Sequence, residues 1–125
     1  MTEPFTLPQT AAQPSQLYLN GSKLSLVTRW FDFDAPNYDP LPVRKFDGRW
    51  TLTDGHTRAF VAHLSGAEEL RVVRDTDDIP VSKYERCVSW CRDEGITDIS
   101  DLAGRVVTGA TFETRWVDRC RSLDS

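Results

Sequence analysis

The order of apolar and polar residues predicts alternating strands and helices over the first part of the chain. Residues 15–20 alternate polar and leucine side chains, which is typical of a half-buried strand. An Asn-Gly pair follows, and Ser22 is placed to cap a helix over residues 22–31. Residues 32–40 hold two prolines and three aspartates. They therefore predict a loop.

A hairpin and a second helix follow in the middle of the chain. Asp47-Gly48 is a strong two-residue turn signal, and the residues on either side of it alternate apolar and polar. A helix is expected from Gly55 to a stop at Gly66, and residues 70–75 predict another strand. This order implies an α+β fold: a small mixed β-sheet with flanking helices.

From Pro80 onward the apolar spacing changes to three and four residues, which predicts helices. The first is expected between a Ser82 cap and Gly95. A short one should follow an Asp98 or Ser100 cap, and a third is expected within residues 110–123. We therefore expect a C-terminal helical cap.

The predicted elements group into one domain with three segments. Residues 1–14, rich in proline, threonine, glutamine and alanine, are expected to form an extended N-terminal lead-in that is ordered only if it packs back onto the domain. Residues 15–78 should form the mixed α+β part, and residues 79–125 a helical extension packed on it. A length of 125 residues leaves no room for a second core.

Composition and charge narrow the class of protein. The sequence is 39% hydrophobic and 27% charged, which is too apolar for disorder and too polar for a membrane span. Its start lacks the basic and apolar parts of a secretory signal, so a cytoplasmic protein without membrane contact is expected. The net charge is −4 and the basic residues are scattered among acids. Nucleic acid is therefore an unlikely partner, and a small molecule or a protein is favoured.

Three cysteines, Cys87, Cys91 and Cys120, fit no disulfide framework because their number is odd. Cys87 and Cys91 would share one helix face. A metal or redox pair completed by Cys120 is one interpretation. The spacing is not a common zinc spacing, and no histidine is near in sequence. Buried structural cysteine, without a metal, is the favoured interpretation.

The junction before the second helix carries most of the chemistry in the sequence. It reads Asp54-Gly55-His56-Thr57-Arg58. A first helical turn presents unpaired backbone N–H groups and the positive end of the helix dipole, which favour a phosphate. Arg58 adds a guanidinium suited to phosphate oxygens, while His56 and Thr57 can donate hydrogen bonds. The alternative is structural: Asp54 is a common N-cap residue and no ligand is required.

Several motifs in the region of roughly residues 14–75 resemble the ParB/sulfiredoxin-type nucleotide-binding domain. They are Leu41-Pro42-Val43 in a strand, Phe46-Asp47-Gly48-Arg49 in a hairpin, and Gly55-His56-Thr57-Arg58-Ala59 at a helix start. The last corresponds to the Gly-x-x-Arg phosphate motif of that family. The DGHxR form is similar to ParB-like proteins outside chromosome segregation, which include free-serine kinases. The resemblance does not extend to the helical tail.

The sequence also departs from two branches of that family. Sulfiredoxins have a catalytic cysteine immediately before the histidine, where this sequence has Gly55, so repair of sulfinic acids is excluded. Chromosomal ParB proteins have Gly-Glu-Arg-Arg, whereas His56 and Thr57 occupy the middle positions here, and the acidic tail offers no basic recognition helix. DNA binding and nuclease activity are therefore less favoured.

The resemblance implies that a nucleotide triphosphate or diphosphate binds with Mg²⁺ at residues 54–58. We expect Arg44 to line the same cleft, together with Gln16 and Tyr18. Three hypotheses remain open: a small-molecule phosphotransferase (a kinase) or nucleotide hydrolase, a non-catalytic nucleotide-sensing or protein-interaction module, and a structural domain without a ligand. A kinase needs a carboxylate that accepts the proton of the substrate hydroxyl. The candidate catalytic residues are Asp32, Asp34, Asp39 and His56.

Overall fold

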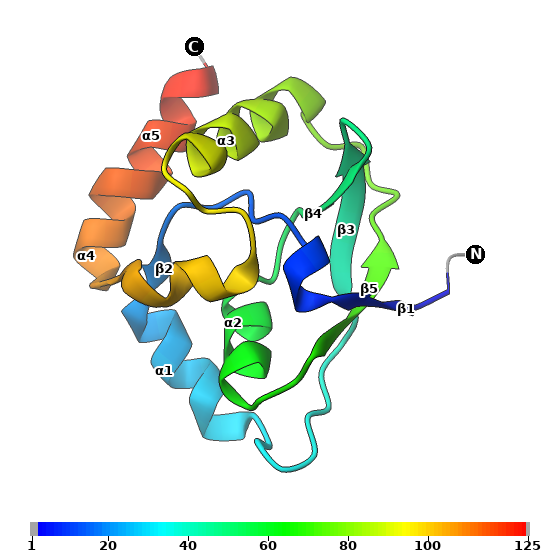
Figure 1. The fold of residues 1–125 in the computed structure, drawn as a ribbon. Coiled ribbons are helices and arrows are strands. Elements are labelled where there is room, and N and C mark those ends of the chain that lie inside the picture. The colour runs from blue at the N-terminus through cyan, green and yellow to red at the C-terminus, as the bar shows by residue number, and fades with distance from the viewer. Residues whose placement is uncertain (1–2, 125) are drawn as a thin grey trace.

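The chain folds into a mixed sheet flanked by helices, as a computed structural model shows for residues 3–124 (Figure 1). The elements in chain order are β1 (Phe5–Pro8), a 3₁₀ turn (Gln9–Ala11), β2 (Leu19–Asn20), α1 (Gly21–Trp30), β3 (Leu41–Phe46), β4 (Arg49–Leu52), α2 (His56–Leu64), β5 (Glu69–Arg74), α3 (Val81–Asp93), a 3₁₀ helix (Ile99–Gly104), β6 (Val106–Val107), α4 (Gly109–Phe112), a π-helical turn (Glu113–Val117), α5 (Asp118–Arg121) and a 3₁₀ turn (Ser122–Asp124). The α+β class expected from the sequence is confirmed.

The main sheet has four strands in the order β1-β5-β3-β4. β3 runs parallel to β5 and antiparallel to β4, while β1 is antiparallel to β5. The β3–β4 hairpin turns at Asp47 and Gly48, whose φ angles of 55° and 77° are those of the predicted two-residue turn. Leu41, Val43, Leu70 and Val72 of β3 and β5 are fully buried. The sheet therefore turns this apolar face toward the core.

The N-terminal lead-in packs back onto the domain as the edge strand β1. Phe5 lies opposite Val72 of β5 in the register, and the backbone of Gln9 continues the contact by donating to Glu68. Sequence alternation did not indicate this strand, because two prolines flank an ambiguous short run. Its order comes from pairing with a strand that lies more than sixty residues later.

The predicted strand over residues 15–20 is mostly wrong. Only Leu19 and Asn20 pair, and they pair with Val106 and Val107 of β6 in a separate parallel ladder. Ser15 forms no strand pair. Its amide donates to Nε2 of His56 at 2.9 Å, and its hydroxyl donates to the Leu52 carbonyl at 2.7 Å. The alternation of polar and apolar residues correctly indicated which side chains are buried, since Leu17 and Leu19 are both fully buried. It did not determine the backbone partner.

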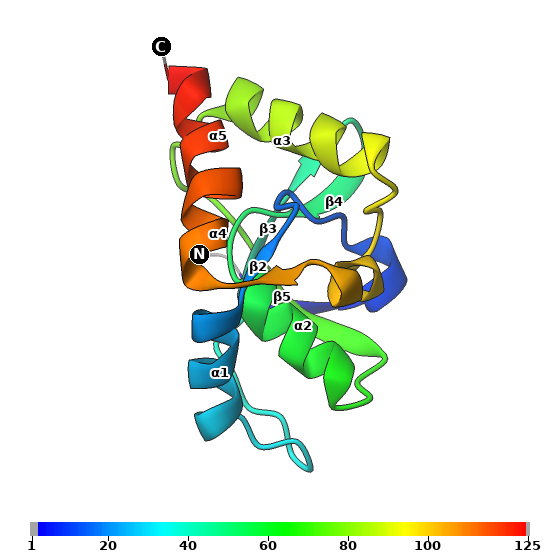
Figure 2. The ribbon, with the colours of Figure 1, turned by 90° about the vertical axis from the view of Figure 1, so that its left-hand side faces the viewer.

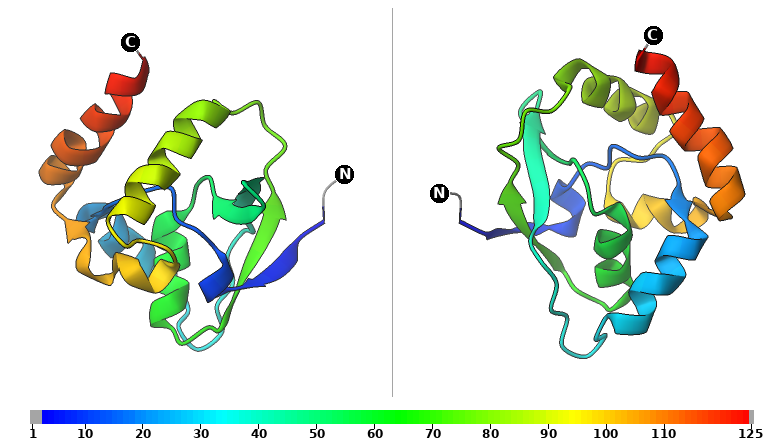
Figure 3. Two further views of the ribbon diagram at one scale, coloured as in Figure 1. Left: turned by 45° about the horizontal axis from the view of Figure 1, so that its top comes forward. Right: turned by 180° about the vertical axis from the view of Figure 1, so that it is seen from behind.

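The helices surround α2, which lies in the middle of the molecule (Figures 1 and 2). In Figure 1, β3, β4 and β5 of the main sheet lie on one side of α2, while α1, α4, α5 and the short strand β2 lie on the other. Figure 3 shows from two further sides that α3 and the helix of α4 and α5 lie against each other. α2 contributes Ala59, Phe60, Val61 and Ala62 to the core cluster. Because each large side chain stabilises the fold by roughly 1.5–3 kcal/mol when buried, α2 is a main support of the core.

Two helix caps differ from those predicted. α1 begins after Asn20, whose Oδ1 accepts hydrogen bonds from the amides of Ser22 at 2.9 Å and Lys23 at 3.4 Å, so Ser22 is not the cap. α3 begins after Pro80 without a side-chain cap, so Ser82 does not serve there either. The predicted cap of the short helix after α3 is confirmed, because Asp98 caps the 3₁₀ helix in a capping box with Asp101.

Within the C-terminal helical cap, the helix formed by α4, the π-helical turn and α5 packs on α3 through aromatic contacts. Trp116, in the π-helical turn, meets Trp90 of α3 edge to face with ring centroids 6.0 Å apart. Arg119 lies over the same Trp90 ring at 4.0 Å.

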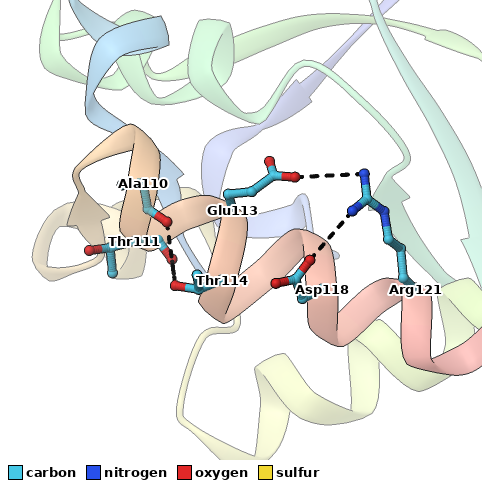
Figure 4. A network of polar contacts seen from close by, with 6 residues as sticks. All are labelled: Ala110, Thr111, Glu113, Thr114, Asp118 and Arg121. Carbon is cyan, nitrogen blue, oxygen red and sulfur yellow. Dashed lines mark hydrogen bonds and ion pairs between the residues drawn. The ribbon is translucent and has the colours of Figure 1, made fainter.

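Polar contacts within the C-terminal helix are drawn in Figure 4. At the π-helical turn, the Thr114 hydroxyl donates to the Ala110 and Thr111 carbonyls. The ion pairs of Arg121 with Glu113 and Asp118 in the same view are exposed and contribute little stability.

Candidate functional site

The α2 N-terminus begins at a glycine that no other residue could replace without strain. Gly55 is the N-cap and has φ of 77°, in the left-handed region. A Cβ at this position would lie 2.8 Å from Cδ2 of the buried Leu41 and 2.9 Å from Nη2 of Arg58. The junction therefore requires glycine for both backbone conformation and space.

The first turn of α2 has three backbone amides without an acceptor among the described residues. The first intrahelical bond runs from the Ala59 amide to the Gly55 carbonyl, and Gly55 has no side chain that could cap the turn. Among residues 3–124, the amides of His56, Thr57 and Arg58 have no hydrogen-bond acceptor. The Gly55 amide differs, because Oδ1 of Asp54 accepts from it at 2.8 Å. The hypothesis that Asp54 caps the helix is wrong, since it reaches only this adjacent amide.

His56 is a fixed neutral side chain at the start of this turn. It is 4% exposed, and its Nε2 accepts a hydrogen bond from the Ser15 amide at 2.9 Å. Burial lowers the pKa of His56 from 6.5 to about 4; the nearby Asp54 carboxylate opposes this shift and Lys23 adds to it. The ring is thus neutral at pH 7. Because Nε2 is an acceptor, Nδ1 carries the proton and remains a donor.

Two cavities adjoin the α2 N-terminus, with His56 lining one and Thr57 the other. The first, of about 200 Å³, also includes Thr53, Lys83 and Tyr84. The second, of about 270 Å³, is lined by Asn20, Lys23, Thr57, Phe112 and Val117, among others. Gln16, Trp116 and Cys120 line both. Residues of the C-terminal helical cap therefore line the cavities at the α2 N-terminus, and Trp116 lines both of them.

The charges around these cavities favour an anion. Each cavity is lined by one lysine, Lys83 in the first and Lys23 in the second, and by no Asp or Glu of the described chain. Thr57 is 4% exposed, and its hydroxyl has no hydrogen-bond partner within residues 3–124. Tyr84 is anchored differently, since its hydroxyl donates to the Thr53 carbonyl at 3.0 Å. Burial raises the pKa of Tyr84, so it stays a donor at neutral pH.

The two predicted site arginines lie in different places. Arg58 lies beside Gly55 at the α2 terminus, where Nη1 approaches the Asp39 carbonyl at 3.5 Å, and it has no ion pair with a described residue. Arg44 lies on β3 and donates to the Asp75 carbonyl at 2.6 and 3.0 Å and to the Asp77 carbonyl at 2.7 Å. Its guanidinium holds the loop after β5. Arg44 lines neither of the two cavities, so the structure does not bring it to the α2 terminus.

The predicted catalytic carboxylates are not gathered at the junction. Asp32, Asp34 and Asp39 are exposed in the loop between α1 and β3. Oδ1 of Asp32 accepts from the amides of Asp34 and Ala35, which makes it a turn residue. Only the backbone of Asp39 comes near the α2 terminus, through its contact with Arg58. None of the three lines either cavity.

The three cysteines lie together between α3 and α5 as free thiols. A hydrogen bond with the Cys120 thiol, followed by burial, raises the pKa of Cys87, and burial raises that of Cys91 to about 12. Thiols in this state are weak nucleophiles and weak metal ligands. Within residues 3–124, no group of three or more His, Cys, Asp or Glu side chains is arranged to hold a metal ion.

The Mg²⁺ implied by the resemblance does not fit a protein-held site here. A magnesium ion held by protein usually needs at least one carboxylate, and no Asp or Glu of the described chain lines either cavity. We therefore assign no residue of this chain to a metal.

Several residues around the junction were missed by sequence reasoning. Lys83, Tyr84 and Trp116 come from the helical tail, for which no site had been predicted, and Ser15 and Thr53 come from connections. No spacing in the sequence links these residues to residues 54–58. Gln16, which was expected to line the cleft, does line both cavities, whereas Tyr18 lines neither and lies under Arg105.

Comparison with known proteins does not assign a family. No protein-family model and no curated protein matches the sequence. Among solved structures, the fold is similar to that of protein Atu1540 from Agrobacterium tumefaciens, at 14% identity and a TM-score of 0.48. The similarity covers 78% of this chain and 51% of that one, so the chain spans about half the length of that protein. Within residues 3–124, no helix has the length and apolar character needed to cross a membrane.

Proposed function

We propose that the chain binds the phosphate group of a nucleotide at the N-terminus of α2. The observation that carries the proposal is the set of three consecutive amides, of His56, Thr57 and Arg58, that have no acceptor in the part of the chain that the structure describes. They lie at the positive end of a nine-residue helix, which attracts an anion. The resemblance of Gly55-His56-Thr57-Arg58 to the ParB/sulfiredoxin phosphate motif supports the same assignment.

Further groups around the turn suit a phosphate. The unpartnered Thr57 hydroxyl and the Nδ1–H of His56 are neutral donors, and Lys23 and Lys83 line the adjoining cavities. Arg58 is held by one long contact to a carbonyl, so its guanidinium is available to turn toward an anion at small cost. A nucleoside would extend from the phosphate into the space that Trp116 lines.

We favour a nucleotide-binding module over a phosphotransferase. A phosphotransferase needs a carboxylate within about 3 Å of the substrate hydroxyl. No described residue that lines the two cavities is Asp or Glu, and the loop aspartates lie elsewhere. A module of this kind would sense a nucleotide and relay its presence through the helical cap, which closes over the site.

Calorimetric titration with ATP, CTP and pyrophosphate, with and without Mg²⁺, tests the proposal. Saturable binding of at least one nucleotide is expected, and Arg58→Ala should weaken it by about tenfold or more, because one charge-assisted hydrogen bond contributes roughly 1.5–3 kcal/mol. Arg86→Ala is the matched control, since Arg86 is exposed on α3 and lines none of the described cavities. Equal affinity of the wild type and Arg58→Ala, or no binding at all, would overturn the proposal.

A further inference from the structure

An open groove lies between α1 and the segment that leads from β6 into α4. Its volume is about 990 Å³, and it shares no described lining residue with the two cavities at the α2 terminus. Figure 2 shows α1 and α4 following one another along one side of the molecule. Leu26 of α1 and Val106 of β6 line the groove and are 58% and 40% exposed. Exposed apolar side chains that share a groove are typical of an interaction surface.

The charge of this groove is positive. Arg29 of α1 and Arg115 of the π-helical turn line it, and no Asp or Glu of the described chain does. Both arginines are exposed, and neither makes an ion pair or a hydrogen bond with a described residue. The chain as a whole has a net charge of −4, so the groove differs from the rest of the surface. It therefore favours an acidic occupant that also carries apolar surface.

The loop between α1 and β3 has the opposite charge. Residues 30–40, which we call the acidic loop, hold three aspartates and no lysine or arginine. Phe33 stands between two of these aspartates and is 41% exposed, and Trp30 at the end of α1 is 53% exposed. In Figure 1 the loop is the cyan segment at the lower end of the molecule. It thus presents carboxylates and aromatic rings together.

Contacts within the acidic loop hold it in one shape. Oδ1 of Asp32 accepts from the Asp34 amide at 3.0 Å, and the Phe33 ring meets the buried Phe31 ring edge to face with centroids 5.5 Å apart. The Asp34 carboxylate has no hydrogen bond or ion pair with a described residue. A loop that is already ordered loses little conformational entropy when it binds. Asp34 is therefore free to pair with a cation at small cost.

We propose that the groove binds the acidic loop of a second copy of this chain, so that two copies form a symmetric dimer through antiparallel α1 helices. Ser22, Ser25, Leu26 and Arg29 line the groove and share one face of α1, because they are three or four residues apart. Antiparallel packing places the C-terminal end of one α1, which the acidic loop follows, beside the N-terminal half of the other. A two-fold axis forms this contact twice.

The chemistry of the two surfaces matches in this arrangement. Phe33 would pack on the partner's Leu26 and the partner's Val106, and Asp34 would pair with the partner's Arg115. Each copy thus covers an apolar groove and neutralises guanidiniums that no described residue of their own chain pairs. The inference stands independently of the proposed nucleotide, because it uses no residue of the α2 terminus.

Sedimentation velocity of the intact chain at several concentrations and salt levels tests the proposal. A reversible equilibrium between monomer and dimer is expected at concentrations up to about 1 mM. The dimer should weaken as NaCl rises from about 50 to about 500 mM, because salt screens pairs of opposite charge at a surface. A monomer over the whole range, or a dimer that salt does not weaken, would overturn the proposal.

Charge reversal assigns the contact to the groove and the loop. Arg29→Glu combined with Arg115→Glu, and separately Asp34→Arg, should each weaken the dimer by about tenfold or more, because each change places like charges together twice. The variant with all three changes should return to within about threefold of the wild-type affinity. Arg86→Glu combined with Arg92→Glu is the matched control, since both residues are exposed on α3 and lie outside the groove. Loss of the dimer without recovery in the triple variant contradicts the contact.

A leucine pair tests the apolar part of the interface. Leu26→Ser should weaken the dimer by about tenfold, because each copy loses a large side chain that dimerisation buries. Leu64→Ser is the control, because Leu64 is 53% exposed on α2 and lies outside the groove. Both side chains are exposed, so circular dichroism should show a folded chain in each variant. Equal dimer affinity of the two variants would place the interface elsewhere and overturn the proposal.

Discussion

The N-termini of α1 and α2 lie in neighbouring, packed helices and are built in opposite ways. At α1, Asn20 closes the first turn by accepting from the amides of Ser22 and Lys23. At α2, Gly55 has no side chain, and the amides of the first turn have no acceptor in the described chain. The first arrangement uses the amides for stability, and the second leaves them without an acceptor in the described chain.

The contrast between the capped start of α1 and the uncapped start of α2 bears on why residues 54–58 carry so many polar groups. A helix start needs only one short polar side chain, and Asn20 shows that this protein can supply one. At α2 the backbone instead turns through a glycine in the left-handed region, and a neutral histidine, a threonine and an arginine lie at the open amides. Stability given up at one helix end is typical of a binding site.

The largest effect is expected from Gly55→Ala. The left-handed backbone and the close approach of Leu41 Cδ2 at 2.8 Å should together lower the free energy of unfolding by about 3 kcal/mol. Chemical denaturation measures this change. Gly66→Ala is the matched control, because Gly66 also has a positive φ but has no atom within 4 Å of the added Cβ, so it should lose only about 1 kcal/mol. Equal losses in the two variants would show that the packing around Gly55 is loose.

Acid should weaken the α2 terminus through His56. Its pKa is about 4 in the folded chain and 6.5 in the unfolded one, so the unfolded state binds more protons between these values. Stability is therefore complete above pH 6.5 and falls as the pH drops toward 4, by about 3 kcal/mol in total. Denaturation at a series of pH values measures the slope.

His56→Asn serves as the control for this pH dependence. Asparagine can still accept from the Ser15 amide but does not titrate, so the loss between pH 6.5 and 4 should disappear. Asp101, whose pKa is lowered from 3.8 chiefly by its hydrogen bond from the Thr97 amide, acts only below this window. An unchanged slope in His56→Asn would contradict the assignment.

A smaller effect is expected from Asn20→Ala, which converts the capped helix end into an uncapped one. Loss of the bonds to Ser22 and Lys23 should lower stability by about 1 kcal/mol. Because Asn20 shares a cavity with Thr57 but is not part of the α2 turn, phosphate affinity should change by less than about twofold. A thermal melt and a nucleotide titration of the same sample separate the two outcomes, and a large loss of affinity with intact stability would place Asn20 in the site.

The smallest effect on stability is expected from Thr57→Val. The shape is kept and an unpartnered hydroxyl is removed, so the free energy of unfolding should change by less than about 0.5 kcal/mol. Nucleotide affinity should nevertheless fall severalfold, because one donor to the phosphate is lost. Calorimetry and denaturation together check both statements. Unchanged affinity would place the phosphate away from the Thr57 side of the turn.

Much of the fold followed from local patterns. The β3–β4 hairpin, α2, β5 and the C-terminal helices lie close to where periodicity, Asp47-Gly48 and the stop at Gly66 placed them. β1 and the coil at Ser15 did not follow. Both are ordered by partners distant in sequence, β1 by β5 and Ser15 by His56 and Leu52. Local propensity carries no information about such partners.

In the candidate site too, some residues could be identified from the sequence and others only from the folded structure. Residues 55–58 were identified from the sequence because a glycine before a helix predicts unpaired amides wherever the fold places them. Arg44 was expected in the same cleft, but a guanidinium on a strand can reach either neighbour, and here Arg44 donates to the Asp75 carbonyl after β5. The sequence by itself determined the helix terminus and its polar groups. Only tertiary packing decided that Lys23, Lys83 and Trp116 surround it, because burial and side-chain direction depend on chain segments that meet only after folding.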